Sequence, residues 1–568
     1  MPSPLRRAHT AAAVLVAVVS VLACTVASAH ATVQPRLIVG FTTNASSAVQ
    51  ADVVARSGSG AKVRIPALRA VVVQPAPGRL AAVRRQLLAR PGVAFVEVDH
   101  VARAYDLEAE ASTGVAAAWQ PNDTFYSQQW ALATIGADQA WERTRGTGVT
   151  IAVLDTGVDY IHPDLAGRID LGRDFVGKDD DPMDVQGHGT HVSGIVAANA
   201  DDGFGVAGVA PGARVLAVRV LDEQGAGNYS TVADGIVYAA KRGAKVINLS
   251  LGGPERSELL HAAIDYAAAR GAIVTCATGN DGARAIGYPA RYESCLAVGA
   301  SDVSDSVADF SNQGAGIDLV APGAGILSST MGGSHDSWDG TSMATPYAAG
   351  VAALLYSQGL GRREVLAALT STAKDIDADG PENASGAGRI DAAAATEAAS
   401  RSPRRSADTT APTVTAITLL PRRELVRSSA KTVWKLRKRT GFTRVGTTDY
   451  RGAYAYSKVS LKGAVRTTQT FRFRGGVVYR STLVQVRTKV VTRLRSYVVP
   501  VQVTAADDVA VDRVALELDG RVVGVDWTAA GGWTVEVPCT TGAHSVVASV
   551  FDVADNEGAG SSRLSLRC

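Results

Sequence analysis

Between about Trp119 and Ala398 the sequence alternates short, almost purely apolar stretches with longer helix-like ones. The apolar stretches include VTIAVLD, RVLAVRVL, KVINLSLG and AIVTCATGN, and the helix-like ones include STVADGIVYAAKRG and LLHAAIDYAAARG. Continuous Val, Ile and Ala strands between helices are typical of a parallel sheet that is covered on both faces. We therefore expect an α/β domain over residues 119–398, built on a doubly wound parallel sheet.

Polar residues follow two of these strands directly. Asp155 ends VTIAVLD, and Asn280 ends AIVTCATGN. In an open α/β sheet, functional groups gather at the carboxyl ends of the strands. Both residues are therefore candidates for a site at that edge.

The segment GTSMATP at 340–346 offers a serine, Ser342, just before an apolar, helix-like run. Small neighbours leave room for a substrate backbone, and a helix N-terminus would point at the reaction. A serine in this position is more often a helix cap than a nucleophile. The motif therefore indicates a nucleophile only if a base and its supporting residues are found elsewhere in the chain.

Partners are present in LDTGVD at 154–159, GHGTHVSG at 187–194 and ATGN at 277–280. A serine hydroxyl needs a base, and His188 stands between two glycines that leave space around its ring. Asp155 can orient that ring, while the Asn280 amide and the Ser342 N–H can stabilise an oxyanion. Each residue also has a structural reading, as a turn cap or a buried histidine, but their joint occurrence favours catalysis.

With these motifs in this order, residues 32–398 resemble the subtilisin family of serine endopeptidases. The resemblance implies the family's catalytic roles for Asp155, His188 and Ser342, and an oxyanion-donor role for Asn280. Two positions depart from the family pattern: Thr345 and Tyr347 stand where serine and histidine are common. Neither belongs to the triad, and we interpret both as changes in helix packing.

The resemblance also implies a cleft in which the substrate pairs as an added β-strand. The cleft residues that it predicts are Gly225, Ala226, Gly227, Ser250, Leu251, Gly252 and Gly287. Small or apolar pocket walls suit a large uncharged side chain before the scissile bond. Alignment of the preceding segment puts the first cleavage after Tyr105, which agrees with that preference.

A calcium ion is the cofactor that the resemblance implies. The matching side chains are Asp123, Asp164 and Asp202, and the matching backbone carbonyls are those of Ala200, Phe204 and Val206. Calcium prefers such hard oxygen ligands. The alternative is a set of solvated loop acids.

At 568 residues the chain should hold several domains. Residues 1–31 combine early arginines, an apolar run and small residues, which is typical of a secretory signal, with a membrane anchor as the alternative. Residues 32–105 mix strand-like and helix-like stretches and resemble an inhibitory propeptide. Residues 106–118 are predicted to be a processed linker.

After a polar linker at 399–410, residues 411–568 lose the helical pattern and alternate as strands. We expect a β-sandwich there, with a second sandwich inserted at about 425–495. Two sandwiches in tandem are the alternative.

Four cysteines remain once the signal is removed, and an even count in an exported chain suggests disulfides. We favour Cys276 with Cys295 and Cys539 with Cys568, because each pair would lie within one domain. Free buried thiols are the alternative for the first pair.

The net charge of +3 conceals a strong asymmetry. Residues 421–500 contain 20 Lys and Arg residues against only Glu424 and Asp449. Such a segment could attach the protein to an anionic cell wall or polysaccharide, or it could be an ordinary solvated β surface.

Together these features predict a secreted serine endopeptidase, made as a zymogen that its own propeptide inhibits and that processes itself. We expect protein or peptide substrates, no nucleic-acid partner and a monomer, with attachment to the cell surface as an option. The alternative from another class is a catalytically silent adhesion protein that uses its β-sandwiches. Ester hydrolysis or acyl transfer would use the same acyl-enzyme.

Overall fold

The computed structural model describes residues 35–42, 45–58, 60–105, 107–108, 121–376 and 384–401. In the C-terminal region it describes 413–419, 423–440, 442–447, 454–462, 465–474, 477–506, 511–518, 521–526, 533–538, 542–552 and 557–566. The predicted signal (1–31), nearly all of the two predicted linkers, and Cys539 with Cys568 lie outside these ranges. Within them, no helix is both long and apolar enough to cross a membrane.

An antiparallel four-stranded sheet with two helices forms the N-terminal unit. Its elements are β1 (Leu37–Phe41), α1 (Ser47–Arg56), β2 (Ala61–Ile65), β3 (Ala70–Val73), α2 (Leu80–Leu88) and β4 (Val93–Val98), and the strand order is β2-β3-β1-β4. Successive side chains along each strand point to opposite faces of this sheet, so the two faces pack into different hydrophobic cores. Leu37 and Val39 pack with α1 and α2, whereas Ile38 and Val72 join the core of the next domain.

The next domain is built around seven parallel strands in the order β15-β14-β13-β11-β7-β9-β8. These are β7 (Thr150–Asp155), β8 (Ile169–Asp174), β9 (Arg214–Arg219), β11 (Val246–Leu249), β13 (Ile273–Ala277), β14 (Cys295–Ser301) and β15 (Leu319–Pro322). Helices α5 (His188–Ala197) and α8 (Thr341–Ser357) contribute to one core, and α6 (Tyr229–Lys241) and α7 (Glu258–Ala269) to the other. The two cores receive alternate residues of β7, so both faces of the sheet are covered, and the predicted doubly wound α/β class is confirmed.

Shorter elements complete this domain. They are α3 (Trp130–Thr134), α4 (Ala137–Trp141), α9 (Arg362–Ser371), α10 (Ala392–Arg401), β10 (Ala226–Asn228), β12 (Leu251–Gly252), β16 (Ile326–Thr330) and β17 (Ser334–Asp339), with 3-10 turns at Tyr126–Gln128 and Pro163–Leu165. The N-terminal unit has its own 3-10 turn at Pro66–Leu68 and continues into β5 (Val101–Ala104) and β6 (Leu107–Glu108), which pair with strands of this domain. The sulfurs of Cys276 and Cys295 join the neighbouring strands β13 and β14, with 6.1 Å between the Cα atoms.

Two β-sheets form the C-terminal region. One contains β18 (Thr413–Leu419), β19 (Arg423–Arg439), β20 (Thr443–Thr447), β21 (Tyr454–Lys462), β22 (Val465–Arg474), β23 (Val477–Ala506) and β26 (Trp533–Pro538). The other contains β24 (Val511–Leu518), β25 (Arg521–Asp526), β27 (Gly542–Asp552) and β28 (Glu557–Leu566). Val501 and Val503 of the first sheet share a core with Leu516 and Val550 of the second.

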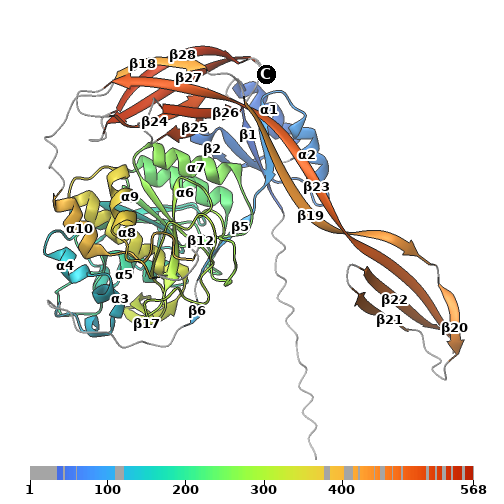
Figure 1. Ribbon diagram of the computed structural model, residues 1–568, viewed down its shortest axis with the longest axis horizontal. Helices are drawn as coiled ribbons and strands as arrows, with labels where there is room; N and C mark the ends of the chain where they lie inside the picture. Colours follow the sequence, from blue (N-terminus) through green and yellow to red (C-terminus); the bar gives the residue numbers. More distant parts are fainter. Residues whose placement is uncertain are drawn as a thin grey trace, which may run out of the picture.

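The long strand β23 belongs to both ends of this region. Its last residues pair with β18 and β26, while its earlier residues pair with β19, β20 and β22. In Figure 1, β19 and β23 run together as an arm that carries β20, β21 and β22 away from the rest of the molecule. The predicted insertion at 425–495 therefore falls on this arm, which continues the first sheet, and its boundaries as a domain stay a prediction.

Candidate active site

The carboxyl end of β7 holds Asp155, which is fully buried. Its Oδ1 atom accepts a hydrogen bond from the Thr156 N–H at 2.7 Å and lies 2.7 Å from Nδ1 of His188. Burial raises the pKa of Asp155, and the contact with His188 acts in the opposite direction. The pair is therefore a carboxylate and an imidazole held together away from water.

His188 begins α5, and the glycines beside it explain how it comes so close to β7. A Cβ atom on Gly189 would lie 2.0 Å from the Gly157 carbonyl oxygen and 3.0 Å from the Asp155 Cβ. Gly187 at the N-cap has φ 113°, a conformation that glycine adopts without strain. The G-H-G sequence thus allows the helix to start against the end of the strand.

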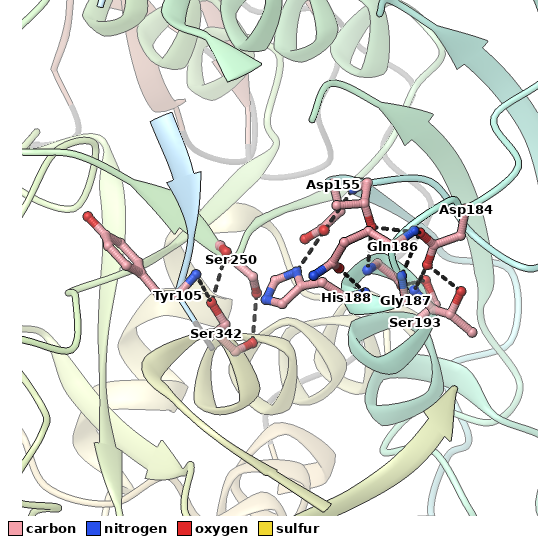
Figure 2. Close-up of polar contacts among 12 residues, drawn as sticks. Tyr105, Asp155, Asp184, Gln186, Gly187, His188, Ser193, Ser250 and Ser342 are labelled. Atoms are coloured by element: carbon pink, nitrogen blue, oxygen red, sulfur yellow. Dashed lines mark hydrogen bonds and ion pairs between the residues drawn. The ribbon is translucent and has the colours of Figure 1, made fainter. Parts of the chain in front are cut away.

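Ser342 lies in the first turn of α8, fully buried. Its hydroxyl donates to the Ser250 carbonyl at 2.9 Å and accepts a hydrogen bond from the Tyr105 N–H at 3.0 Å. The Ser250 hydroxyl in turn donates to the Ser342 carbonyl at 2.7 Å. Figure 2 shows the His188 ring between Asp155 on one side and Ser342 and Ser250 on the other.

Asn280 lies beside the same serine turn. Its side-chain oxygen accepts from the Thr341 N–H at 2.9 Å and from the Thr341 hydroxyl at 2.8 Å, which fixes the amide. A Cβ on Gly340 would lie 3.0 Å from Asn280 Nδ2 and 2.4 Å from the Tyr105 carbonyl oxygen. Nδ2 is buried and makes no hydrogen bond to any described residue, so a donor stands unused close to that carbonyl.

The strand β5 fills the groove that the sequence predicts. It lies between β10 and β12, with Ala226 opposite Arg103, Gly227 opposite Ala102 and Leu251 opposite Ala104. The Gly225 carbonyl accepts from the Ala104 N–H at 3.0 Å. The predicted residues 225–227 and 250–252 therefore flank one extended segment, which ends at Tyr105.

The Tyr105 side chain lies in a recess that is bounded by glycines. Cβ atoms on Gly252 and Gly287 would be 2.8 Å and 3.1 Å from its hydroxyl oxygen, and one on Gly279 would be 3.7 Å from the ring. Burial raises the pKa of the Tyr105 phenol. The recess thus accepts a large aromatic side chain because three of its wall residues have none.

These contacts place the Ser342 hydroxyl and the Asn280 amide donor beside the Tyr105 peptide. Figure 2 shows the His188 imidazole next to that serine, with the buried Asp155 carboxylate on the far side of the ring. This set can carry out acyl transfer, in which the serine attacks and the amide stabilises the oxyanion. Comparison with known proteins agrees. Residues 146–388 match the model of the Subtilase family.

The chain is 46% identical over 263 residues to Thermitase from Thermoactinomyces vulgaris, a match that covers 46% of this chain and 94% of that protein. The chain belongs to the subtilase family. It is also 49% identical over 266 residues to a Thermophilic serine proteinase from Bacillus sp. (strain AK1), covering 66% of that protein and 46% of this chain. Subtilisin Savinase from Lederbergia lenta is 43% identical over 273 residues, which is 99% of its length and 48% of this chain's. The activity of this subtilase is accordingly that of a serine endopeptidase.

The predicted calcium ligands of this subtilase gather around the loop from Ala200 to Val206. Asp164 is fully buried and Asp123 nearly so, and each has an Oδ1 atom without a hydrogen-bond partner among the described residues. Burial raises the pKa of Asp123, and the neighbouring carboxylates of Asp202 and Asp164 raise it further. Carboxylate oxygens that lack hydrogen-bond partners and repel one another are the kind of group that a divalent cation would bind and neutralise.

Two details of this region were not predicted. Asp164 Oδ2 already receives the Val206 N–H at 3.1 Å and lies 2.5 Å from His335 Nε2. Asp202 is exposed, and its carboxylate accepts from the Phe204 N–H at 3.0 Å. Within the ranges that the structure describes, no three His, Cys, Asp or Glu side chains are grouped as a metal cluster, so backbone carbonyls would have to supply much of the coordination.

Sequence reasoning missed the other side of the cleft. Beyond Tyr105, β6 pairs with β17, with Leu107 opposite Asp339 and Glu108 opposite Trp338. The Trp338 ring stacks on His191 with 4.5 Å between centroids and lies 6.3 Å from the His188 ring. The segment SHDSWD of β17 carries no motif of its own, and only its place immediately before GTSMATP could have suggested this role.

Proposed function

We propose that this subtilase is exported as a zymogen and cleaves its own chain after Tyr105 through an acyl-enzyme on Ser342. In this proposal His188 is the base, Asp155 orients it, and Asn280 with the Ser342 N–H stabilises the oxyanion. The observation that carries the proposal is the 3.0 Å contact between the Ser342 hydroxyl and the Tyr105 N–H, with β5 paired in the groove. The segment that ends at Tyr105 thus occupies the position of a substrate or a product.

A Ser342→Ala chain tests the proposal directly. We expect it to be secreted unprocessed and to lack peptidase activity, whereas Ser304→Ala, a change at an exposed serine away from the groove, should be processed normally. Mass spectrometry of both secreted forms gives the new N-termini. Cleavage after Tyr105 in the Ser342→Ala chain, expressed alone in a host without this protease, would contradict self-processing.

The N-terminal unit is proposed to act as the inhibitor of its own enzyme. Three features support this role: its sheet packs on the core that includes α6 and α7, its β5 strand fills the groove, and its carboxylates reach the starts of those helices. Inhibition ends when the unit is degraded. The peptidase activity of purified zymogen should therefore rise with a lag that shortens as mature enzyme is added.

The substrate preference that we propose is a large uncharged residue before the scissile bond. The recess around Tyr105, with Gly252 and Gly287 against the phenol, supports it. A cleavage profile on a peptide library is expected to favour Phe, Tyr and Leu at that position. A strong preference for Arg or Asp would contradict it.

A structural calcium ion is proposed between Asp123, Asp164, Asp202 and the carbonyls of Ala200, Phe204 and Val206. When bound, the ion would neutralise the buried carboxylates and tie the three segments together. Chelation should lower the melting temperature of the Ser342→Ala chain, and added calcium should restore it. In an Asp123→Asn variant the effect of the chelator should shrink, and an unchanged melting temperature in the parent chain would remove the calcium site.

The basic C-terminal region is proposed to hold the enzyme on an anionic cell wall. The supporting observations are the 20 Lys and Arg residues within 421–500 and the described strands of this segment, which form an arm that extends away from the body. Binding of the Ser342→Ala chain to purified walls should fall steeply as salt rises. Equal binding by a chain that ends at residue 401 would contradict the attachment role.

A further inference from the structure

Asp184 is a second buried carboxylate beside the active site, and sequence reasoning did not identify it. The residue is only 2% exposed. Its Oδ1 atom accepts from the Thr156 hydroxyl at 2.8 Å and from the N–H groups of Gln186 and Gly187 at 3.0 and 2.9 Å. Its Oδ2 atom accepts from the Thr190 N–H at 2.9 Å and from the Thr190 hydroxyl at 2.5 Å.

No Lys, Arg or His side chain in the described part of the chain forms an ion pair with Asp184. Five hydrogen bonds, three of them from N–H groups at the start of α5, compensate for its burial instead. Such a carboxylate is favoured at the positive end of a helix. Replacing it by a neutral group would leave several of these donors poorly satisfied.

The five donors come from both segments that carry the catalytic pair. Thr156 directly follows Asp155, donates its N–H to that carboxylate at 2.7 Å, and accepts from the Gly189 N–H at 3.0 Å. Thr190 lies in the first turn of α5 after His188, and its hydroxyl accepts from the Asp159 N–H at 2.9 Å. Figure 2 shows Asp184 with Gln186 and Gly187 immediately beside the contact between Asp155 and His188.

We propose that Asp184 is a positioning residue that locks the start of α5 to the end of β7 and so holds the His188 ring against Asp155. The inference rests on the proposed roles of His188 and Asp155. Apart from Asp184, the two segments are joined by the 2.7 Å contact of the catalytic side chains and by the N–H bonds of Gly189 and Asp159 to two threonine hydroxyls. Asp184 holds both of these hydroxyls, those of Thr156 and Thr190, and so orients these links as well. Catalytic groups must keep their geometry to about 0.5 Å, and a displacement of about 1 Å can reduce the rate about 100-fold.

The charge of Asp184 adds an electrostatic consequence. The titratable groups around it are Asp155 and Asp159 from the β7 side and His188 and His191 from α5. Burial is the main cause that raises the pKa of Asp155, and the negative charge of Asp184 adds to it. Neutralising Asp184 removes a negative charge from beside the catalytic pair, which should move the acid limb of the kcat/KM profile to lower pH.

Asp184→Asn is the direct test, with Asp174→Asn as the matched control. Asp174 is also 2% exposed and accepts from the N–H groups of Val176 and Gly177. Unlike Asp184 it pairs with an arginine, Arg219, at 2.7 Å, and it lies on the edge strand β8, with β9 between it and β7. Both variants should melt at lower temperature. Only Asp184→Asn should lose turnover, about 10- to 100-fold in kcat with KM changed less than about 3-fold, when rates are corrected for active sites.

If Asp184→Asn does not fold, Thr156→Val and Thr156→Ser decide the question, because both keep the Asp184 carboxylate. Thr156→Val removes the hydroxyl that joins Asp184 to the Gly189 N–H, and Thr156→Ser keeps that hydroxyl. Thr156→Val should lower kcat several-fold without changing KM, and Thr156→Ser should restore it. Equal kcat in these two variants, or a kcat and pH profile of Asp184→Asn that match those of Asp174→Asn, would overturn the inference. His188→Ala distinguishes a failure of the proposed function from a failure of the positioning role. If His188→Ala keeps full turnover, the proposed base is wrong. If His188→Ala is inactive while Asp184→Asn is fully active, only the positioning role of Asp184 fails.

Discussion

At the scale of single residues, glycines define the specificity recess as much as side chains do. A Cβ on Gly287 would lie 3.1 Å from the Tyr105 hydroxyl and 3.4 Å from the Gly253 carbonyl, so alanine there reaches the tip of a bound tyrosine first. Gly287→Ala should therefore reduce kcat/KM for substrates with Tyr before the scissile bond about 10-fold more than for Phe or Leu. The three peptides, assayed on the same preparation, provide the internal control. An equal loss of kcat/KM on all three peptides would mean that Gly287 does not bound the part of the recess that receives the tyrosine hydroxyl.

Asp318 provides a pH-dependent test of burial. Its carboxylate accepts from the Ala297 N–H at 2.7 Å, and burial raises its pKa from 3.8 to about 6. Because the folded pKa is raised, the folded state binds the proton more tightly, and stability falls as pH rises from about 4 to about 6. At pH 8 the full penalty is present, on the order of 2 kcal/mol.

Asp318→Asn removes that penalty and leaves an oxygen to accept from Ala297. In the Ser342→Ala background, which prevents self-digestion, the variant should unfold with about 2 kcal/mol more free energy than its parent at pH 8 and with little difference at pH 4. Urea titrations at both pH values measure this. A variant less stable at pH 8 would mean that the charge itself is needed there.

At the scale of elements, the N-terminal unit is joined to the catalytic domain by two helix caps. Glu97 at the end of β4 accepts from the Ser257 hydroxyl at 2.7 Å and from the N–H groups of Glu258 and Leu259 at 2.9 and 3.2 Å, at the start of α7. Asp99 accepts from the Ser230 N–H at 3.0 Å at the start of α6. Negative groups at helix N-termini are stabilising.

Glu97→Ala should therefore weaken the unprocessed chain by about 1 to 2 kcal/mol, measured as a lower melting temperature in the Ser342→Ala background. If cleavage follows Tyr105 as proposed, mature enzyme prepared from a Glu97→Ala precursor will lack residue 97 and should melt like the wild type. A lower melting temperature of that mature enzyme would point to an effect on folding rather than on docking.

The elements also show why some features of the fold and the site could be predicted from the sequence and others could not. The alternation of apolar strands and helices predicted the parallel sheet, since both features arise from local residue patterns. The glycines around His188 were predicted only to leave room for its ring, and their role in letting α5 begin against β7 is visible only in the folded chain. Asp184 gave no such signal, because its role depends on donors from two segments that meet only in the folded chain. The pairing of β6 with β17 was hidden for the same reason.

At the scale of the whole molecule, the catalytic domain and the C-terminal sandwich have separate cores. The sandwich core consists of residues between Val499 and Val550, whereas the catalytic cores draw on residues between Ile38 and Ala399. β25 lies near α7 and is the main contact between the two regions among the described elements. Separate cores mean that each part buries its own apolar surface.

A chain that ends at residue 401, after α10, should therefore fold, process itself and cleave small peptides with kcat/KM within about 2-fold of the full-length enzyme. Its melting temperature should fall by a few degrees at most, because the main contact that it loses among the described elements is that of α7 with β25. The control is a chain that ends at residue 389, which removes α10 and its packing against α4 and α8 and should not accumulate. If the 401-residue chain also failed to accumulate, the C-terminal region would be needed for folding of the protease and not only for its attachment.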